Sequence, residues 1–385
     1  MKIPENFPLP PPSPWRTDRR AGERPQVAVL MSGGVDSSVA AWLLQEAGWR
    51  GVGVTMTFWA PGDSDAPEVC RQLGMSHLFL DARKAFEEHV LAPFRRAYAS
   101  GETPSPCVAC NTALKFGFAW EMVRRHLGIS WIATGHYARV LHRPEAVRLA
   151  RARDLRRDQS AFLYGIPPAR LGQILFPLGE LTKEEVRSLA RQAELPTSER
   201  RDSMDLCFVG EGDYRQALDP ALLHNPGPIL DEEGHVLGAH PGIAHFTPGQ
   251  RHGLGIASPV PLYVLRVDGE RNALVVGPRE RAHQREVEAC QVRRLAPDLL
   301  VPGARLWGKV RAPGPLTPCT VERLEGDELR CRFDTPVFAP APGQHLVLYG
   351  EEGNVVVGGG VVTAPCSSGE DAPSKEAPEG LSPPR

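Results

Sequence analysis

Residues 27–44, VAVLMSGGVDSSVAAWLL, combine an apolar strand, a glycine-containing turn and a helix that begins immediately after it. Gly33 and Gly34 allow the backbone to adopt positive φ angles and to approach an anion closely. The N–H groups at the start of the following helix lie at the positive end of its dipole and can surround the same anion. The stretch therefore predicts a strand, turn and helix unit that binds phosphate.

The polar side chains of this turn are also suited to phosphate. Ser32, Ser37 and Ser38 supply hydroxyl donors, and Asp36 can hold a magnesium ion or cap the helix. An SGG turn alone is equally typical of an ordinary strand-to-helix connection, and the chain contains neither G-x-x-x-x-G-K-[ST] nor G-x-G-x-x-G. The full string SGGVDSS at 32–38 resembles the pyrophosphatase loop of the ATP-pyrophosphatase superfamily. That resemblance implies an enzyme that adenylates a carbonyl oxygen and expels pyrophosphate.

The composition indicates a multidomain chain. With 385 residues it is long enough for two or three domains, and its formal net charge is −2. Arginines are nevertheless concentrated at 139–157, where seven occur within nineteen residues. The chain has no apolar run long enough to span a membrane and no signal-peptide pattern, so we expect a cytoplasmic protein. Eight cysteines in such a chain favour catalytic, metal-binding or buried roles over a disulfide framework.

The pattern of apolar residues changes along the chain and predicts an order of domains. Short apolar strands alternate with helical stretches at 84–98 and 114–127, which predicts an α/β domain with a parallel sheet. Thr182 and Glu185 have the spacing of a capping box at the start of a further helix. The predicted segments are a disordered tail (1–24), a PP-loop ATP-binding domain (25–165), a helical connector with a cysteine (166–212), a central β-rich domain (213–281), a C-terminal β-barrel (282–363) and a second disordered tail (364–385).

Three cysteines occur in motifs that suggest chemistry. Residues 103–111, TPSPCVACN, place Cys107 and Cys110 just before a predicted helix, where a thiolate is stabilised and reactive. Residues 201–208, RDSMDLCF, supply Cys207 far downstream. A single C-x-x-C also fits half of a zinc site, a redox pair or two packed thiols. Zinc is disfavoured because no second C-x-x-C or H-x-x-x-H supplies the remaining ligands.

Taken in order, the motifs of this chain resemble those of the tRNA-specific 2-thiouridylase family over about residues 26–362. They are SGGVDSS, TPSPCVACN followed by KFG, ATGHYA, RDQSAFL, DSMDLCF, FTPGQRHGLGI, PLYVLRVD and APGQHLVLY. The resemblance implies an adenine nucleotide alpha-hydrolase-like (PP-loop) fold. It also implies that ATP is bound by Leu30, Met31, Ser32, Gly33, Gly34, Val35, Asp36, Ser37, Met56 and Gly135.

The same resemblance implies the reaction and the partners. Family members adenylate O2 of the wobble uridine of certain tRNAs and then replace that oxygen with sulfur. The implied catalytic residues are Asp36, Cys110 and Cys207, and the implied cofactors are ATP and Mg²⁺. We expect a monomer that binds tRNA and receives sulfur from a donor protein, such as a desulfurase or relay, or from sulfide. The residues implied near tRNA are Arg157, Asp158, Gln159 and Arg311.

One position departs from much of the family, because many members carry Asp where this chain has Cys107. Two sulfur routes are therefore open. In one, a persulfide on Cys207 attacks the activated uridine and Cys110 resolves the resulting disulfide. In the other, Cys107, Cys110 and Cys207 ligate three irons of a [4Fe–4S] cluster whose fourth iron carries sulfide. Three thiols at one site favour the cluster.

Two other functions remain alternatives at this point. A ligase of the same superfamily, which adenylates a carbonyl for attack by ammonia, would need an ammonia-producing module that this length does not accommodate. A non-catalytic RNA-binding protein with a structural metal cluster would not release pyrophosphate. The histidines at 235, 240, 245 and 252 match no standard metal-ligand spacing and are expected in loops or at RNA.

Overall fold

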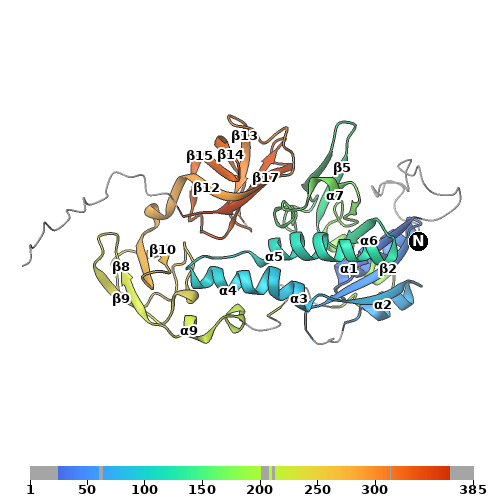
Figure 1. The fold of residues 1–385 in the computed structure, drawn as a ribbon, viewed down its shortest axis with the longest axis horizontal. Coiled ribbons are helices and arrows are strands. Elements are labelled where there is room, and N and C mark those ends of the chain that lie inside the picture. The colour runs from blue at the N-terminus through green and yellow to red at the C-terminus, as the bar shows by residue number, and fades with distance from the viewer. Residues whose placement is uncertain (1–24, 60–63, 201–207, 210–212, 313, 365–385) are drawn as a thin grey trace, which may run out of the picture.

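A computed structural model describes residues 25–59, 64–200, 208–209, 213–312 and 314–364 (Figure 1). The predicted disordered tails at 1–24 and 364–385 lie outside the described residues, except for Ala364, and Cys207 also lies outside them. Within the described residues, a parallel sheet, a central mixed sheet, in which β11 and β8 pair in parallel, and a C-terminal barrel follow one another along the chain. In Figure 1 the parallel sheet lies at the right, the central sheet at the lower left and the barrel at the top.

The first domain is built on a five-stranded parallel sheet with β1 at its centre. The alternate side chains of β1 enter two different cores: Ala28 and Leu30 pack with Ile132, whereas Val27 and Val29 pack with Leu44. Burial of both faces is typical of parallel sheets and explains the continuous apolar run. The strand order is β3 (Ser76–Asp81), β2 (Arg50–Thr57), β1 (Gln26–Leu30), β4 (Trp131–Thr134) and β7 (Ile174–Leu175). The predicted α/β class is confirmed.

Two long helical runs flank this sheet and extend toward the central domain (Figure 1). The first consists of α3 (Arg83–Phe86), a π-helical segment (Glu87–Leu91) and α4 (Ala92–Ala99). The second consists of α5 (Pro106–Ala109), a π-helical segment (Cys110–Ala119) and α6 (Trp120–Leu127). Both predicted helices are present, but the second begins eight residues earlier than expected, since Pro106 is favourable in a first turn. The two thiols of the C-x-x-C motif therefore lie in the helix, not before it.

The fifth strand, β7, lies beyond the boundary expected at residue 165 and completes the sheet of the first domain. The helices α1 (Val35–Glu46), α2 (Ala66–Gln72), α7 (Pro168–Leu171) and α8 (Lys183–Gln192) complete the first domain and its connector. The central domain begins with α9 (Pro220–Leu223). Its sheet has the order β10 (Leu262–Asp268), β11 (Ala273–Pro278), β8 (Gly227–Leu230) and β9 (Val236–His240).

The C-terminal domain is a closed barrel. Its strands are β12 (His283–Arg294), β13 (Arg305–Lys309), β14 (Thr317–Glu325), β15 (Glu328–Phe338), β16 (His345–Gly350) and β17 (Val355–Val362). The order β12-β15-β14-β13-β16-β17 is closed by pairing of β12 with β17. Closure leaves these six strands without a free edge. The predicted β-barrel is confirmed.

A hairpin of the first domain joins the barrel. Its strands β5 (Ala138–His142) and β6 (Val147–Arg151) extend the barrel sheet, because Ala150 of β6 pairs with Val355 of β17. Arginines from the basic stretch reinforce this junction: Arg143 pairs with Glu351, and Arg148 pairs with Asp298. Two of the seven arginines at 139–157 thus bind acidic side chains of the barrel domain, whereas Arg139, Arg151 and Arg153 pair with acidic residues of the first domain and its connector.

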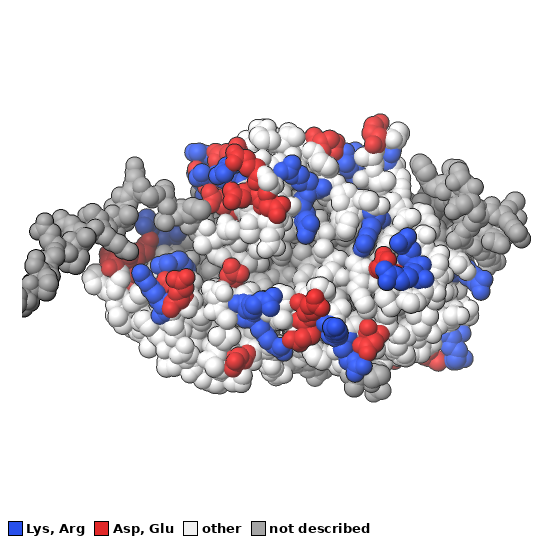
Figure 2. Space-filling model, in the orientation of Figure 1, with Lys and Arg blue, Asp and Glu red and all other residues white. Residues whose placement is uncertain are grey.

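Charge on the remaining surface is mixed. Figure 2 shows basic and acidic side chains interspersed on the face in view. Several of them form ion pairs along the helices, such as Arg95 with Glu87 at 2.8 Å. Among the described residues, no helix is both long and apolar enough to cross a bilayer.

The capping box predicted for α8 is present and provides a test of helix stability. The Glu185 N–H donates to Thr182 Oγ1 at 3.2 Å, and the Thr182 N–H donates to Glu185 Oε2 at 2.7 Å. Thr182→Ala removes the cap and is expected to lower the free energy of unfolding by about 1 kcal/mol in urea titrations. Ser188→Ala, an exposed change on the same helix, is the control. Equal stability of the two variants would contradict this role.

Candidate active site

The turn after β1 has the tight geometry expected of a phosphate-binding loop. Gly33 has a φ of +76°, and a Cβ added there would lie 2.7 Å from Ser64 Oγ. The hydroxyls of Ser37 and Ser38 both donate to the Gly34 carbonyl, at 3.0 and 2.9 Å. Glycine is therefore required at position 33, and the serines fix the first turn of α1.

Gly135, at the end of β4, passes directly against this first turn. A Cβ at Gly135 would lie 2.7 Å from the carbonyl carbon of Asp36 and 2.8 Å from the Ser37 nitrogen. Only glycine allows this contact between the two backbones. The contact brings the ends of the neighbouring parallel strands β1 and β4 together, where α/β proteins bind ligands.

The next residue, His136, is buried and held in one tautomer. Its Nε2 lies 3.2 Å from Lys115 Nζ, and its Nδ1 lies 2.7 Å from Thr134 Oγ1. An ammonium can only donate, so Nε2 accepts and Nδ1–H donates to the hydroxyl. Burial, reinforced by the Lys115 charge, holds the His136 pKa well below its usual value. The imidazole is therefore neutral at neutral pH.

Asp36 is the point where three elements meet. Its Oδ1 accepts a hydrogen bond from Lys183 Nζ of α8 at 2.7 Å and one from the Tyr137 hydroxyl at 2.9 Å. Tyr137 is in turn bonded through its backbone to Gln159, whose side-chain oxygen accepts from the Tyr137 N–H at 3.0 Å. The N-cap of α1 is Gly34, so the carboxylate of Asp36 does not cap the helix. Sequence reasoning missed Lys183 and Tyr137.

Cys110 lies in an apolar cluster formed where the two long helical runs pack together. It is 7 % exposed and packs with Phe86 and Leu114. Met56 of β2 and Phe208 pack against the same cluster. Met56 was expected at ATP, and Phe208 directly follows Cys207 in sequence. The structure thus places one candidate nucleotide residue against the apolar cluster that contains one candidate thiol.

Apart from Cys107, the other described cysteines belong to other parts of the structure. Cys107 is exposed and stands one helical turn before Cys110 on the same helix. Cys70 belongs to the core behind β1, and Cys319 and Cys331 belong to the barrel core. Cys290 is partly buried on β12.

Several of the residues expected at tRNA make contacts within the protein, among them Arg311, whose Nη2 donates to the carbonyls of Pro248 and Ala339. The Asp158 side chain is 1 % exposed, and its Oδ1 accepts from the backbone N–H groups of Ala152 and Ser160 at 3.0 and 3.2 Å. Arg151 Nε lies 3.3 Å from its other oxygen. Asp158 therefore shapes the loop, and Arg157 is held in that loop through its N–H bond to the Asp154 carbonyl at 3.1 Å.

Arg311 lies across from the thiol helix, on the barrel. It helps to line a small pocket between the barrel and the first domain, with a cavity volume of about 10 Å³. Val108, which lies between Cys107 and Cys110 in the sequence, and Phe162 together line the opposite wall. Burial lowers the pKa of both Arg311 and its neighbour Lys309. The remaining lining residues are Ala161, Ala312, Gln344, His345 and Val347.

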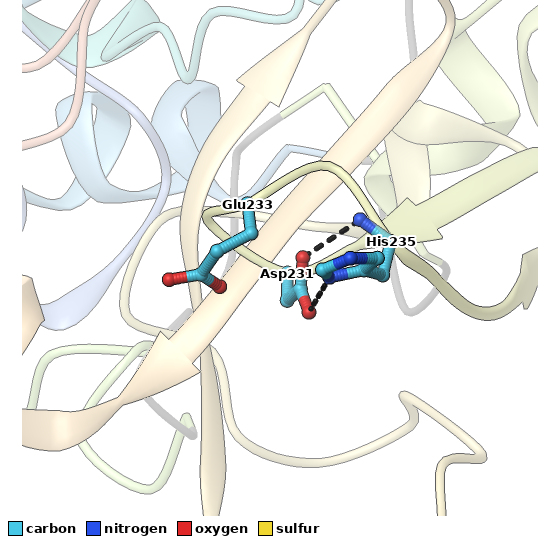
Figure 3. Close-up of side chains that lie close together, drawn as sticks. All are labelled: Asp231, Glu233 and His235. Carbon is cyan, nitrogen blue, oxygen red and sulfur yellow. Dashed lines mark hydrogen bonds and ion pairs between the residues drawn. The ribbon is translucent and has the colours of Figure 1, made fainter.

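A separate acidic group occurs in the turn between β8 and β9. Ligand atoms of Asp231, Glu233 and His235 lie within 4.8 Å of one another (Figure 3). In Figure 3, Asp231 is bonded to His235 twice, through the His235 N–H at 2.7 Å and through Nδ1 at 3.0 Å. Both hydrogen bonds join residues of the same surface turn. We therefore interpret these side chains as stabilising the turn.

Three family models match successive parts of the chain. They are described as the tRNA methyl transferase HUP domain (25–211), the tRNA methyl transferase PRC-barrel domain (215–278) and the Aminomethyltransferase beta-barrel domain (304–362). Among solved structures, a 4-thiouridine synthetase–RNA complex with bound ATP has a TM-score of 0.34 and 16% identity, covering 49% of this chain and 46% of that chain. That similarity is too weak to bear on the site.

Curated relatives match almost the whole chain. A tRNA-specific 2-thiouridylase MnmA from Picosynechococcus sp. is 41% identical over 350 residues, which cover 88% of this chain and 99% of the relative. A second, from Moorella thermoacetica, is 42% identical over 353 residues, which cover 87% of this chain and 98% of the relative. The chain therefore belongs to the tRNA-specific 2-thiouridylase family.

Proposed function

We propose that this chain is an ATP-dependent enzyme that replaces O2 of the wobble uridine of tRNA with sulfur. The observation that carries the proposal is the packing of Met56 against the cluster that contains Cys110. Met56 lies on β2, which pairs with β1, and β1 leads directly into the phosphate turn. Nucleotide activation and thiol chemistry can therefore act on the same base. The names of the curated relatives agree with this reaction.

In the first step, O2 of uridine attacks the α-phosphorus of ATP. The O2–phosphorus bond forms, the bond from the α-phosphorus to the bridging oxygen breaks, and its electron pair leaves on pyrophosphate. The N3 proton of the base is released in this step. The turn at 32–37, together with Gly135, is suited to hold the phosphates through backbone N–H groups and hydroxyls.

Asp36 is the residue that would hold Mg²⁺ in this step. Its Oδ1 accepts from Lys183 and Tyr137, whereas Oδ2 has no hydrogen-bond partner within the described part of the chain. The side chain is 34 % exposed, so Oδ2 can reach an entering ion. Carboxylate oxygen is a preferred ligand of Mg²⁺, and the bound ion would neutralise charge on the triphosphate.

In the second step, a sulfur nucleophile attacks C2 of the adenylated base. The C2–S bond forms, the C2–O bond breaks with its electron pair on AMP, and the N3 proton is regained as the thiocarbonyl forms. Adenylation is necessary because an amide-like oxygen is a very poor leaving group. Cys110 and Cys207 are the proposed sulfur-handling residues, and the contact of Phe208 with the Cys110 cluster supports their pairing.

We further propose that Cys107, Cys110 and Cys207 hold a [4Fe–4S] cluster, which supplies an open iron site for sulfide. Cys107 and Cys110 are three residues apart in one helix, so their side chains lie on the same face. The first of them is exposed and the second faces the apolar cluster. This arrangement is suited to a cluster at the boundary between protein and substrate.

The tRNA is expected over the pocket between the barrel and the first domain. Arg311 lines that pocket, and the loop with Arg157, Asp158 and Gln159 belongs to the domain on its other side. A wobble base must leave its stack to reach the thiols, as single-stranded RNA loops permit. Asp158 is proposed to act by shaping the loop, because its carboxylate is saturated by protein donors.

The reaction can be tested with purified protein, ATP, sulfide and unmodified tRNA. We expect tRNA-dependent pyrophosphate release and formation of 2-thiouridine, measured by mass spectrometry of nucleosides. Cys110→Ser and Cys207→Ser are each expected to abolish thiouridine while tRNA binding stays close to wild type. Cys290→Ser, a partly buried thiol on the barrel, is the matched control. Near-normal thiolation by either of the first two variants would remove that cysteine from the mechanism.

The sulfur route can be tested by iron analysis of anaerobically purified protein. We expect bound iron with broad visible absorption in the wild type, and loss of both in Cys107→Ser, with Cys290→Ser unchanged. If instead the iron-free protein thiolates fully with a persulfide donor and accumulates a Cys110–Cys207 disulfide, the cluster proposal is wrong and the persulfide relay holds.

A further inference from the structure

A buried side chain with an unpaired acceptor, Asn111, lies in the helical run that carries the two thiols. It is 3 % exposed, and its amide nitrogen donates to the Phe162 carbonyl at 3.0 Å. A carbonyl can only accept, so the nitrogen faces Phe162 and Oδ1 is turned away from it. No group in the described part of the chain donates to Oδ1. An unpaired buried acceptor is costly, so its presence here calls for a ligand that donates to it.

Asn111 lies between the two places that the reaction has to join. Val108, three residues earlier, lines the pocket between the barrel and the first domain. Lys115, four residues later, contacts His136 beside the nucleotide loop at 3.2 Å. Residues three and four apart lie on the same face of a helix. One face of this helical run therefore leads from the pocket to the nucleotide loop, with Asn111 between them.

The carbonyl that orients this amide is itself fixed. Phe162 ends a 3₁₀ helix (Ser160–Phe162), and its N–H donates to the Gln159 carbonyl at 2.9 Å. At the other end of that helix, Ser160 Oγ donates to Asp158 Oδ2 at 3.0 Å. The side-chain oxygen of the asparagine therefore has a defined direction and can act as a preorganised acceptor.

The proposed reaction requires selection of the base. Cytosine carries the same C2 carbonyl as uracil, so the chemistry of adenylation does not exclude it. The two bases differ at N3, which is an N–H donor in uracil and an unprotonated acceptor in cytosine. A fixed acceptor binds the first and repels the second. Sites built to bond a substrate N–H strongly reject analogues that lack it.

We propose that Oδ1 of Asn111 accepts the N3–H of the target uridine and thereby selects uridine over cytidine. N3 is bonded to C2, so the same hydrogen bond orients the C2 carbonyl. The bond is made to the substrate and again to the product, because N3 loses its proton on adenylation and regains it when sulfur enters. The pocket beside Phe162 has a volume of about 10 Å³, room for a single water, so it widens as the base enters. This inference deepens the proposed function and rests on it.

A purely structural role is the competing explanation, in which Asn111 only ties its helix to Phe162. Asn111→Ala removes the acceptor and the donor together. Asn111→Asp separates them, because it keeps an oxygen acceptor and loses the amide donor. Thr112→Val is the matched control. The Thr112 hydroxyl is also buried with no partner among the residues that the structure describes, but it lies against Gly165, on a different face of the helix.

The test measures pyrophosphate release with two tRNA transcripts that differ only in the wobble base, uridine or cytidine. We expect the wild type to prefer the uridine transcript in kcat/KM. For Asn111→Ala the ratio of the two kcat/KM values should fall by about 30-fold. Asn111→Asp should keep most of this ratio, and Thr112→Val should match the wild type.

Three results would overturn the inference. The first is an unchanged ratio in Asn111→Ala, and the second is an equal loss of the ratio in Asn111→Ala and Asn111→Asp, which indicates that only the tie to Phe162 matters. The third is a wild type that accepts both transcripts equally. If Asn111→Ala does not fold, the ratio is measured on Asn111→Leu, which keeps the size of the side chain but has no acceptor. A wild-type protein that releases no pyrophosphate with the uridine transcript would instead reject the proposed function.

Discussion

The site depends on one carboxylate. Asp36 receives hydrogen bonds from Tyr137, which follows β4, and from Lys183, which begins α8. The three residues come from separate parts of the chain, and Tyr137 and Lys183 both donate to the same oxygen of Asp36. Removing Asp36 would take a carboxylate away from a buried ammonium 2.7 Å from it, which is costly in a region of low dielectric constant. The nucleotide loop, the strand beside it and the connector helix are thus fixed relative to one another by one charge.

Local sequence patterns predicted the elements around this centre well. Alternation of apolar strands with helices gave the parallel sheet, and the spacing of Thr182 and Glu185 gave the start of α8. Both signals arise from residues close in sequence, so they can be read without knowledge of the fold. The helix that carries Cys107 and Cys110 begins earlier than expected, because the proline in its first turn was compatible with either a loop or a helix.

Contacts between distant segments could not be predicted in this way. Lys183 and Asp36 are 147 residues apart, and nothing in the helical pattern of α8 identifies the partner of its first side chain. The sequence shows that the stretch at 139–157 is basic but does not identify its partners, and in the structure Arg143 and Arg148 bind the barrel domain. A run of arginines specifies the sign of its partner but not the kind of molecule. Family resemblance supplied the site residues that spacing alone could not.

The pairing of β6 with β17 has a mechanical consequence. Because the hairpin and the barrel share a continuous sheet, any displacement of the barrel carries β5 and β6 with it. β5 begins at Ala138, three residues after Gly135, whose backbone touches the first turn of α1. A force that a large ligand applies to the barrel is thus transmitted to the nucleotide loop through the few residues that link β5 to Gly135. Movement of the barrel is therefore coupled to the first turn of α1.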